Sequence, residues 1–146
     1  ERMNMSKIAV VYWSGTGNTQ AMAEAVAEGV QKAGAQALLL PVSETDAASV
    51  LACDAVAFGC PAMGAEVLEE SEFEPFFEQA EAGLSGKKTA LFGSYGWGDG
   101  QWMRDWADRV AADGGILVSE PVTANEAPDD DALEACRALG GRLAGV

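Results

Sequence analysis

The sequence predicts an α/β fold, a doubly wound parallel sheet of five strands with helices on both faces. Short, almost continuously apolar runs alternate with segments of helical periodicity along the 146 residues. Strands of this kind are expected where both faces of a sheet are covered. No long linker or repeat interrupts the alternation, and the length is normal for one domain. Right-handed crossovers between parallel strands then give the doubly wound form.

Each element follows from its local pattern. "KIAVVYW" opens the chain as a buried strand, and Met22, Val26 and Val30 then recur at helical spacing. Trp102, Trp106 and Val110 repeat that spacing later. The predicted strands cover 7–13, 35–41, 54–61, 88–94 and 115–123. The predicted helices cover 20–34, 47–52, 73–82, the segment around 102–110, and 129–145.

Composition excludes several classes of function. The net charge is −14, from nine Lys and Arg against 23 Asp and Glu, which argues against nucleic acids and anionic membrane surfaces as partners. It favours a partner with a positive face, although a merely solvated acidic surface is the alternative. Without histidine, the chain has no imidazole catalysis and no histidine metal ligand.

The three cysteines, Cys53, Cys60 and Cys136, form no C-x-x-C pair. They indicate neither a zinc site nor a dithiol motif, and we expect reduced, buried thiols. Reduced thiols are typical of the cytosol, so we expect a cytoplasmic protein. No apolar run is long enough to span a membrane. We expect residues 5–146 to form one domain and residues 1–4 to be a cloning or start-site remnant.

Ligands of doubly wound sheets bind at the carboxyl ends of the strands. The loop "SGTGNT" lies there, between the first strand and the first helix. A helix N-terminus and glycine backbone can hold a phosphate without a lysine. The absence of Lys and Arg between Lys7 and Lys32 excludes a Walker loop, and Gln20 stands where a Rossmann fingerprint needs glycine. A purely structural turn is the alternative.

The loops after the third and fourth strands, "PAMGAEVLEES" and "SYGWGDG", suit a flat ligand. Trp97 offers a stacking face among glycines, and Met63 offers an adaptable apolar face. Burial of Trp97 in the core is the alternative, whereas Trp102 and Trp106 have the spacing of core residues. A phosphate site beside a Met and Trp slot suits flavin mononucleotide (FMN), which has a phosphate at one end and a flat ring at the other.

The segments "VVYWSGTGNT", "GCPAMG", "FGSYGWGDG" and "WMRDW" resemble the flavodoxins, specifically the short-chain group of anaerobic bacteria. The similarity extends over nearly all of residues 5–146. It implies a flavodoxin-like sheet of order 2-1-3-4-5 and non-covalently bound FMN. It further implies a monomeric, low-potential one-electron carrier that cycles mainly between semiquinone and hydroquinone. Its partners would be reductases and low-potential oxidoreductases with basic docking faces, and it would need no catalytic residue and no metal.

The resemblance also implies roles for individual residues. The first loop would hold the phosphate, and Met63 and Trp97 would flank the ring. Glu66 would accept from flavin N3–H, and the carbonyl of Gly64 would face N5. The implied cofactor-binding residues are Ser14, Gly15, Thr16, Gly17, Asn18, Thr19, Pro61, Ala62, Met63, Gly64, Ala65, Glu66, Ser94, Tyr95, Gly96, Trp97 and Gly98.

Ala65 stands where we expect Asp or Ser in the best-known flavodoxins. A type II turn over residues 63–66 needs positive φ at Ala65, whereas a type II′ turn needs it at Gly64. Because positive φ costs alanine about 1 kcal/mol, we predict the type II′ turn. We associate that turn with the reduced state, in which the Gly64 carbonyl faces N5.

Acidic residues follow the Met63 loop with no Lys or Arg among them, and Asp99 adjoins the Trp97 loop. We hypothesise that this acidic rim steers docking, and a solvated face is the alternative. The run from Asp129 to Asp131 indicates a helix N-terminus rather than a metal site. The members of the rim are Glu66, Glu69, Glu70, Glu72, Glu74, Glu78 and Asp99.

Two other functions are compatible with such a fold. One is a flavin-dependent NAD(P)H:quinone reductase, which would need an open flavin face and usually a longer chain. The other is a module that donates electrons to one dedicated enzyme.

Overall fold

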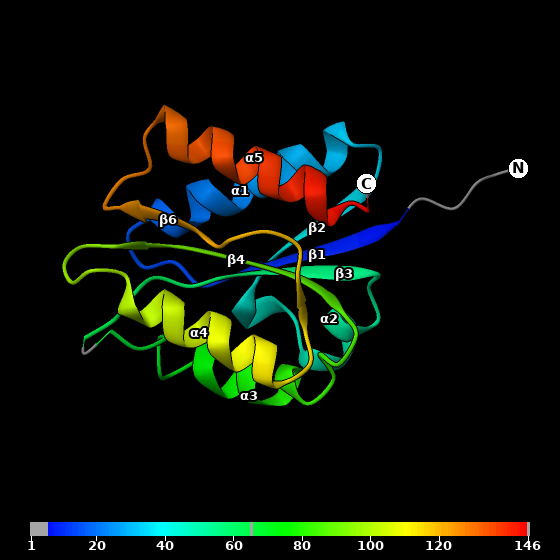
Figure 1. Ribbon diagram of the computed structural model, residues 1–146, viewed down its shortest axis with the longest axis horizontal. Coiled ribbons are helices and arrows are strands. Elements are labelled where there is room, and N and C mark those ends of the chain that lie inside the picture. Colours follow the sequence, from blue (N-terminus) through cyan, green and yellow to red (C-terminus); the bar gives the residue numbers. More distant parts are fainter. Residues whose placement is uncertain (1–5, 65, 146) are drawn as a thin grey trace, which may run out of the picture.

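The computed structural model describes residues 6–64 and 66–145 and has one sheet between two layers of helices (Figure 1). The strands are β1 (Lys7–Tyr12), β2 (Gln36–Pro41), β3 (Ala55–Gly59), β4 (Lys88–Tyr95), β5 (Ile116–Leu117) and β6 (Val122–Asn125). The α-helices are α1 (Asn18–Lys32), α2 (Ala47–Leu51), α3 (Phe73–Glu81), α4 (Gln101–Ala112) and α5 (Asp130–Leu143), and a 3-10 turn, η1, covers Val42–Glu44.

The strand order β2-β1-β3-β4-β5, with every pair parallel, confirms the predicted fold class and order. The prediction of one continuous fifth strand over 115–123 is wrong. Two short segments lie beside β4 instead, with β5 pairing near Lys88 and β6 pairing from Phe92 to Tyr95. Pro121 lies between these segments, and a proline has no N–H to donate to a ladder.

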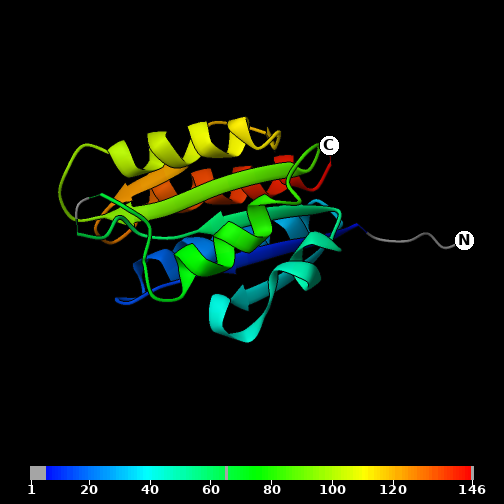
Figure 2. The ribbon, with the colours of Figure 1, turned by 90° about the horizontal axis from the view of Figure 1, so that it is seen from below.

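The two faces of the sheet bury separate apolar clusters, as the doubly wound form requires. Ala9 and Val11 of β1 pack into the cluster that includes α2, α3 and α4. Ile8 and Val10 point to the opposite cluster, which includes α1 and α5. Figure 2, seen from below, shows α2, α3 and α4 on the near side of the sheet. Among the described residues, no helix is long and apolar enough to cross a membrane.

Helices α3 and α4 are joined by an aromatic and ionic contact. Phe77 and Trp106 meet edge to face at 5.7 Å between ring centroids. The guanidinium of Arg109 lies 4.8 Å from the Phe77 ring and donates hydrogen bonds to both Glu74 and Glu81. The hydrogen bond from Arg109 to Glu81 is the main cause that lowers the pKa of the Glu81 carboxyl. Half-buried pairs of this kind fix the helices relative to each other.

Helices α1 and α5 approach each other through glycines. A Cβ atom at Gly29 of α1 would lie 1.9 Å from the carbonyl oxygen of Arg137, and one at Gly140 of α5 would lie 2.1 Å from the carbonyl oxygen of Val26. Real Cβ atoms do not come this close to backbone, so side chains larger than hydrogen would separate the two helices. Gly141, also in α5, has open space around its Cα.

We therefore predict opposite effects for two helix glycines. Gly29→Ala should lower the free energy of unfolding by about 3 kcal/mol because the methyl group overpacks a backbone contact. Gly141→Ala, the matched control, should raise it by about 0.5–1 kcal/mol because alanine favours the helix. Urea denaturation of both variants measures this, and equal effects would show that the α1–α5 contact is looser than the structure has it.

Candidate functional site

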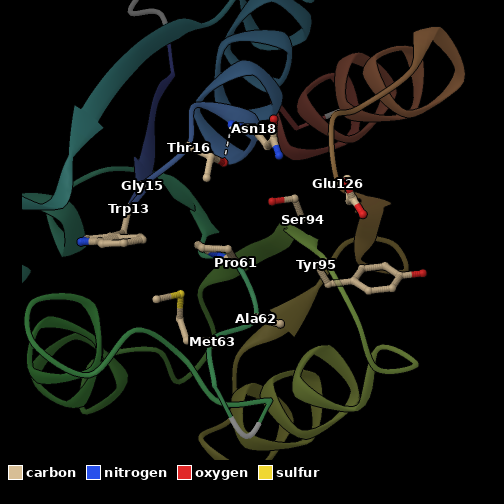
Figure 3. A pocket seen from close by; sticks show the side chains of 11 residues that line it. Trp13, Gly15, Thr16, Asn18, Pro61, Ala62, Met63, Ser94, Tyr95 and Glu126 are labelled. Atoms are coloured by element: carbon tan, nitrogen blue, oxygen red, sulfur yellow. Dashed lines mark hydrogen bonds between the residues drawn. The ribbon is translucent and has the colours of Figure 1, made fainter.

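The carboxyl ends of β1, β3, β4 and β6 meet at one edge of the sheet, at the left of Figure 1. A pocket of about 350 Å³ lies there, a size typical of small-molecule sites (Figure 3). The three predicted loops all contribute to its wall, together with the segment after β6. The lining residues are Trp13, Gly15, Thr16, Asn18, Pro61, Ala62, Met63, Ser94, Tyr95, Gly96 and Glu126, none of them Lys or Arg.

The close approach of β3 and β4 at their carboxyl ends positions the Met63 loop. A Cβ atom at Gly93 would lie 2.2 Å from the carbonyl oxygen of Cys60, so only glycine fits. That carbonyl also accepts a hydrogen bond of 3.2 Å from the indole of Trp102. The N–H of Ala62 then donates to the carbonyl of Ser94 at 3.0 Å. Residues 61–63 are thereby held against the end of β4.

The first loop ends at Gly17, whose φ of +96° starts helix α1. The hydroxyl oxygen of Ser14 accepts from the N–H groups of Gly17 (3.1 Å) and Gln20 (3.2 Å). The hydroxyl of Thr19 is buried and shares a hydrogen bond of 3.1 Å with Ser94. Ser14 and Thr19 therefore order the loop from within, and neither is among the residues that line the pocket.

Thr16 and Asn18 do line the pocket, beside the N-terminus of the 15-residue helix α1. Thr16 accepts from the N–H of Asn18 at 3.4 Å, drawn as the dashed line in Figure 3. The first turn of α1 contains no acidic residue. Its positive dipole end and neutral donors can therefore hold an anion without a basic side chain.

Met63 lines the pocket at the base of a tight hairpin. Its backbone exchanges two hydrogen bonds with Val67, of 2.9 and 3.1 Å. The predicted turn covers residues 63–66, but the residue that pairs with Met63 is Val67, one position later. Gly64 has a φ of +43°, the sign that a type II′ turn requires. Ala65 lies outside the described residues, so the turn type stays a prediction.

Glu66 connects the Met63 loop to the Trp97 loop. Its carboxylate accepts from the N–H of Gln101, the first residue of α4, at 3.0 Å. It lies so close to Gly98 that a Cβ atom there would be 2.7 Å from Glu66 Cδ. Glu66 does not line the pocket itself. Trp97 does not line it either, and its side chain is 65% exposed.

The alternative that Trp97 packs into the core is therefore wrong, whereas the predicted burial of Trp102 and Trp106 is confirmed.

Cys53, Cys60 and Cys136 are buried and unbridged, as predicted. Burial raises the pKa of the Cys136 thiol to about 12. The side chain of Asp129 caps α5 by accepting from Ala132 N–H at 2.8 Å, which confirms the predicted helix start.

Sequence reasoning missed two residues of the pocket, Trp13 and Glu126. The apolar run predicts that Trp13 ends a strand, but its ring packs over Gly15 and its indole N–H donates to Glu72 at 3.0 Å. Glu126 follows the end of β6. The signal that could have found Glu126 is the end of the last strand, because parallel strands end at one edge of the sheet. The predicted strand stops at residue 123, whereas β6 continues to Asn125.

The acidic rim is less uniform than the sequence predicted. Glu69 is buried, and its carboxylate accepts from the N–H groups of Ser71 and Glu72, which precede α3, and of Phe73, its first residue, at 2.8–2.9 Å. Glu74 is paired with Arg109. Glu69 and Glu74 therefore stabilise the fold, and we do not expect them to steer a docking partner. Glu70, Glu72, Glu78 and Asp99 are exposed, although Glu72 accepts from Trp13 and Asp99 forms a surface ion pair with Arg104.

Comparison with known proteins gives consistent matches. A family model described as Flavodoxin matches residues 10–140. The chain is 47% identical to a flavodoxin of Clostridium beijerinckii over 94% of this chain and 99% of that one. It is 44% identical to a flavodoxin of Megasphaera elsdenii, covering 91% and 95%. The solution structure of two-electron reduced Megasphaera elsdenii flavodoxin matches with a TM-score of 0.87, 44% identity, and coverage of 95% and 99%.

The cap of α3 makes a pH-dependent prediction. Burial alone would raise the pKa of Glu69, but the backbone N–H groups of Phe73, Glu72 and Ser71 outweigh it and lower that pKa. The stabilisation is therefore complete above the unfolded pKa of about 4.3 and is lost as pH falls through the lower folded value. Glu69→Gln should cost about 1 kcal/mol at pH 7, and this difference from the native chain should shrink below about pH 4.

Denaturation of both proteins between pH 7 and pH 3 measures the effect. Glu70→Gln, an exposed neighbour, is the control and should match the native chain throughout. A constant difference across this pH range would show that the charge of Glu69 is not what caps the helix.

Proposed function

The chain belongs to the flavodoxin family, in its short-chain group, and we infer from this membership that it is an electron carrier with non-covalently bound FMN. When bound, FMN supplies the redox chemistry, and the protein supplies binding, orientation and electrostatics. The observation that supports this best is the pocket at the N-terminus of α1. It combines an anion site that has no basic side chain with the apolar side chain of Met63.

The described residues fit FMN along the length of the pocket. Thr16, Asn18 and the backbone from Gly15 would hold the phosphate at the helix end. Met63 would contact one face of the ring, and Trp97, on its exposed loop, would cover the other. We retain all the residues that the resemblance implied and add Trp13 as a wall. Within that set, Ser14 and Thr19 act by ordering the loop.

The electrostatics of the pocket favour a strong reductant. Its walls carry neither Lys nor Arg, and the whole chain has a net charge of −14. Adding negative charge to a ligand in such surroundings is disfavoured, because like charges repel most where water is excluded. We therefore propose a low potential, with the carrier working mainly between its one-electron and two-electron reduced states.

Flavodoxins pass electrons to redox partners, and the finer identity of the partners belongs to our proposal. The exposed carboxylates Glu70 and Asp99 lie on the loops that also position Met63 and Trp97. They would favour reductases and low-potential oxidoreductases that have basic docking faces. We further propose that the protein is a cytoplasmic monomer and that residues 5–146 form its single domain.

The cofactor assignment predicts that the purified protein, reconstituted with FMN and desalted, retains flavin absorbance near one FMN per chain. It should oxidise NADH negligibly in the presence of a quinone. Failure to retain FMN would contradict the assignment. Rapid NADH oxidation would favour a flavin-dependent quinone reductase, the runner-up of the same fold.

The docking role of the acidic rim predicts a salt-dependent rate. The double variant Glu70→Gln with Asp99→Asn should reduce cytochrome c, a basic redox probe, about 3-fold to 10-fold more slowly at low salt, and the difference should vanish at high salt.

Glu24→Gln with Glu134→Gln is the matched control, because it removes equal charge from the opposite helical layer, α1 and α5. Its rate should stay near that of the native chain. If the two double variants slow the reaction equally, net charge rather than the rim controls association.

A further inference from the structure

The pocket contains one carboxylate, that of Glu126, and the assignment of FMN gives this group no role. Every other lining residue is neutral. Figure 3 shows Glu126 on the side of the pocket formed by Asn18 and Ser94, away from Trp13 and Met63. It is an exposed residue that lies beside the anion site at α1, on the side away from the residues proposed to contact the ring.

The backbone holds Glu126 in an uncommon conformation. Its φ is +59°, which is unfavourable for a side chain with a Cβ atom. Its N–H donates to the carbonyl of Tyr95 at 2.7 Å, and the side-chain amide of Asn125 donates to the same carbonyl at 3.4 Å. Both bonds join the end of β6 to the end of β4. Backbone strain that is maintained in this way is concentrated at functional sites.

An ionised carboxylate only accepts hydrogen bonds. FMN would present three kinds of group along the pocket: a phosphate, a flat ring, and a polyol chain between them. The phosphate is an acceptor and repels a carboxylate, whereas the polyol hydroxyls are donors that need acceptors. The nearby hydroxyl of Ser94 is already engaged with Thr19.

We propose, on the basis of the proposed function, that Glu126 accepts a hydrogen bond from a hydroxyl of the ligand's polyol chain. Glu126 is then a specificity-determining residue that selects flavins with a hydroxylated chain over flavins without one. Its carboxylate lies at the wall of the pocket beside the anion site, where the polyol chain would leave the phosphate.

Three ligands separate this role from its alternatives. FMN has phosphate, polyol chain and ring, riboflavin lacks only the phosphate, and lumiflavin lacks both phosphate and chain. Their dissociation constants can be measured by quenching of flavin fluorescence with the apoprotein. Glu126→Ala should weaken FMN and riboflavin by the same factor, about 10-fold or more, and leave lumiflavin unchanged. Glu126→Gln, which keeps an acceptor oxygen, should restore part of the affinity.

Glu126→Gly checks that the backbone is not the cause, because glycine adopts positive φ without strain and should show the same ligand pattern as alanine. Glu120→Gln, an exposed carboxylate outside this pocket, is the control and should change nothing.

Other patterns would overturn the proposal. Tighter FMN binding with unchanged riboflavin would mean that the charge opposes the phosphate. Equal weakening of all three flavins would mean a change of pocket shape, and no change would mean no contact. If the native chain binds no FMN, the proposed function fails as well, whereas normal native binding with any of these variant patterns refutes the role of Glu126 alone.

Discussion

The site depends on how closely β3 and β4 approach each other at their carboxyl ends. A Cβ atom at Gly59 would lie 2.2 Å from the ring of Phe92, and one at Gly93 would lie 2.2 Å from the carbonyl oxygen of Cys60. Because two glycines allow this contact, the chain leaving β3 lies directly on the end of β4. The Met63 loop, the Ser94 segment and the N-terminus of α1 then converge on one pocket.

The first loop shows how a phosphate site can be built without a cation. Ser14 binds two N–H groups at the start of α1, so the loop is ordered by its own hydroxyl groups. The hydrogen bond between Thr19 and Ser94 joins the first turn of α1 to β4. Such a site relies on neutral donors and a helix dipole. It places no positive charge beside a cofactor that has to give up electrons.

Sequence patterns predicted the parts that depend on local periodicity and on the rule that parallel strands end together. They gave the order of strands and helices, the converging loops and the buried indoles of Trp102 and Trp106. They missed features that depend on contacts between distant residues. No local pattern shows that Arg109 neutralises Glu74, or that Trp13 reaches Glu72. An acidic run is usually solvated, so the local pattern predicts surface charge at Glu69 and not its hydrogen bonds to the start of α3.

The most direct test of this account is a titration of the ¹⁵N-labelled apoprotein with FMN and then riboflavin, followed through backbone amide shifts. The neutral phosphate site predicts that FMN shifts the amides of residues 15–18 strongly. Riboflavin, which lacks the phosphate, should leave them nearly unchanged while both ligands shift the amides around Met63. Equal shifts of residues 15–18 by the two flavins would contradict the claim that this loop and the start of α1 hold the phosphate.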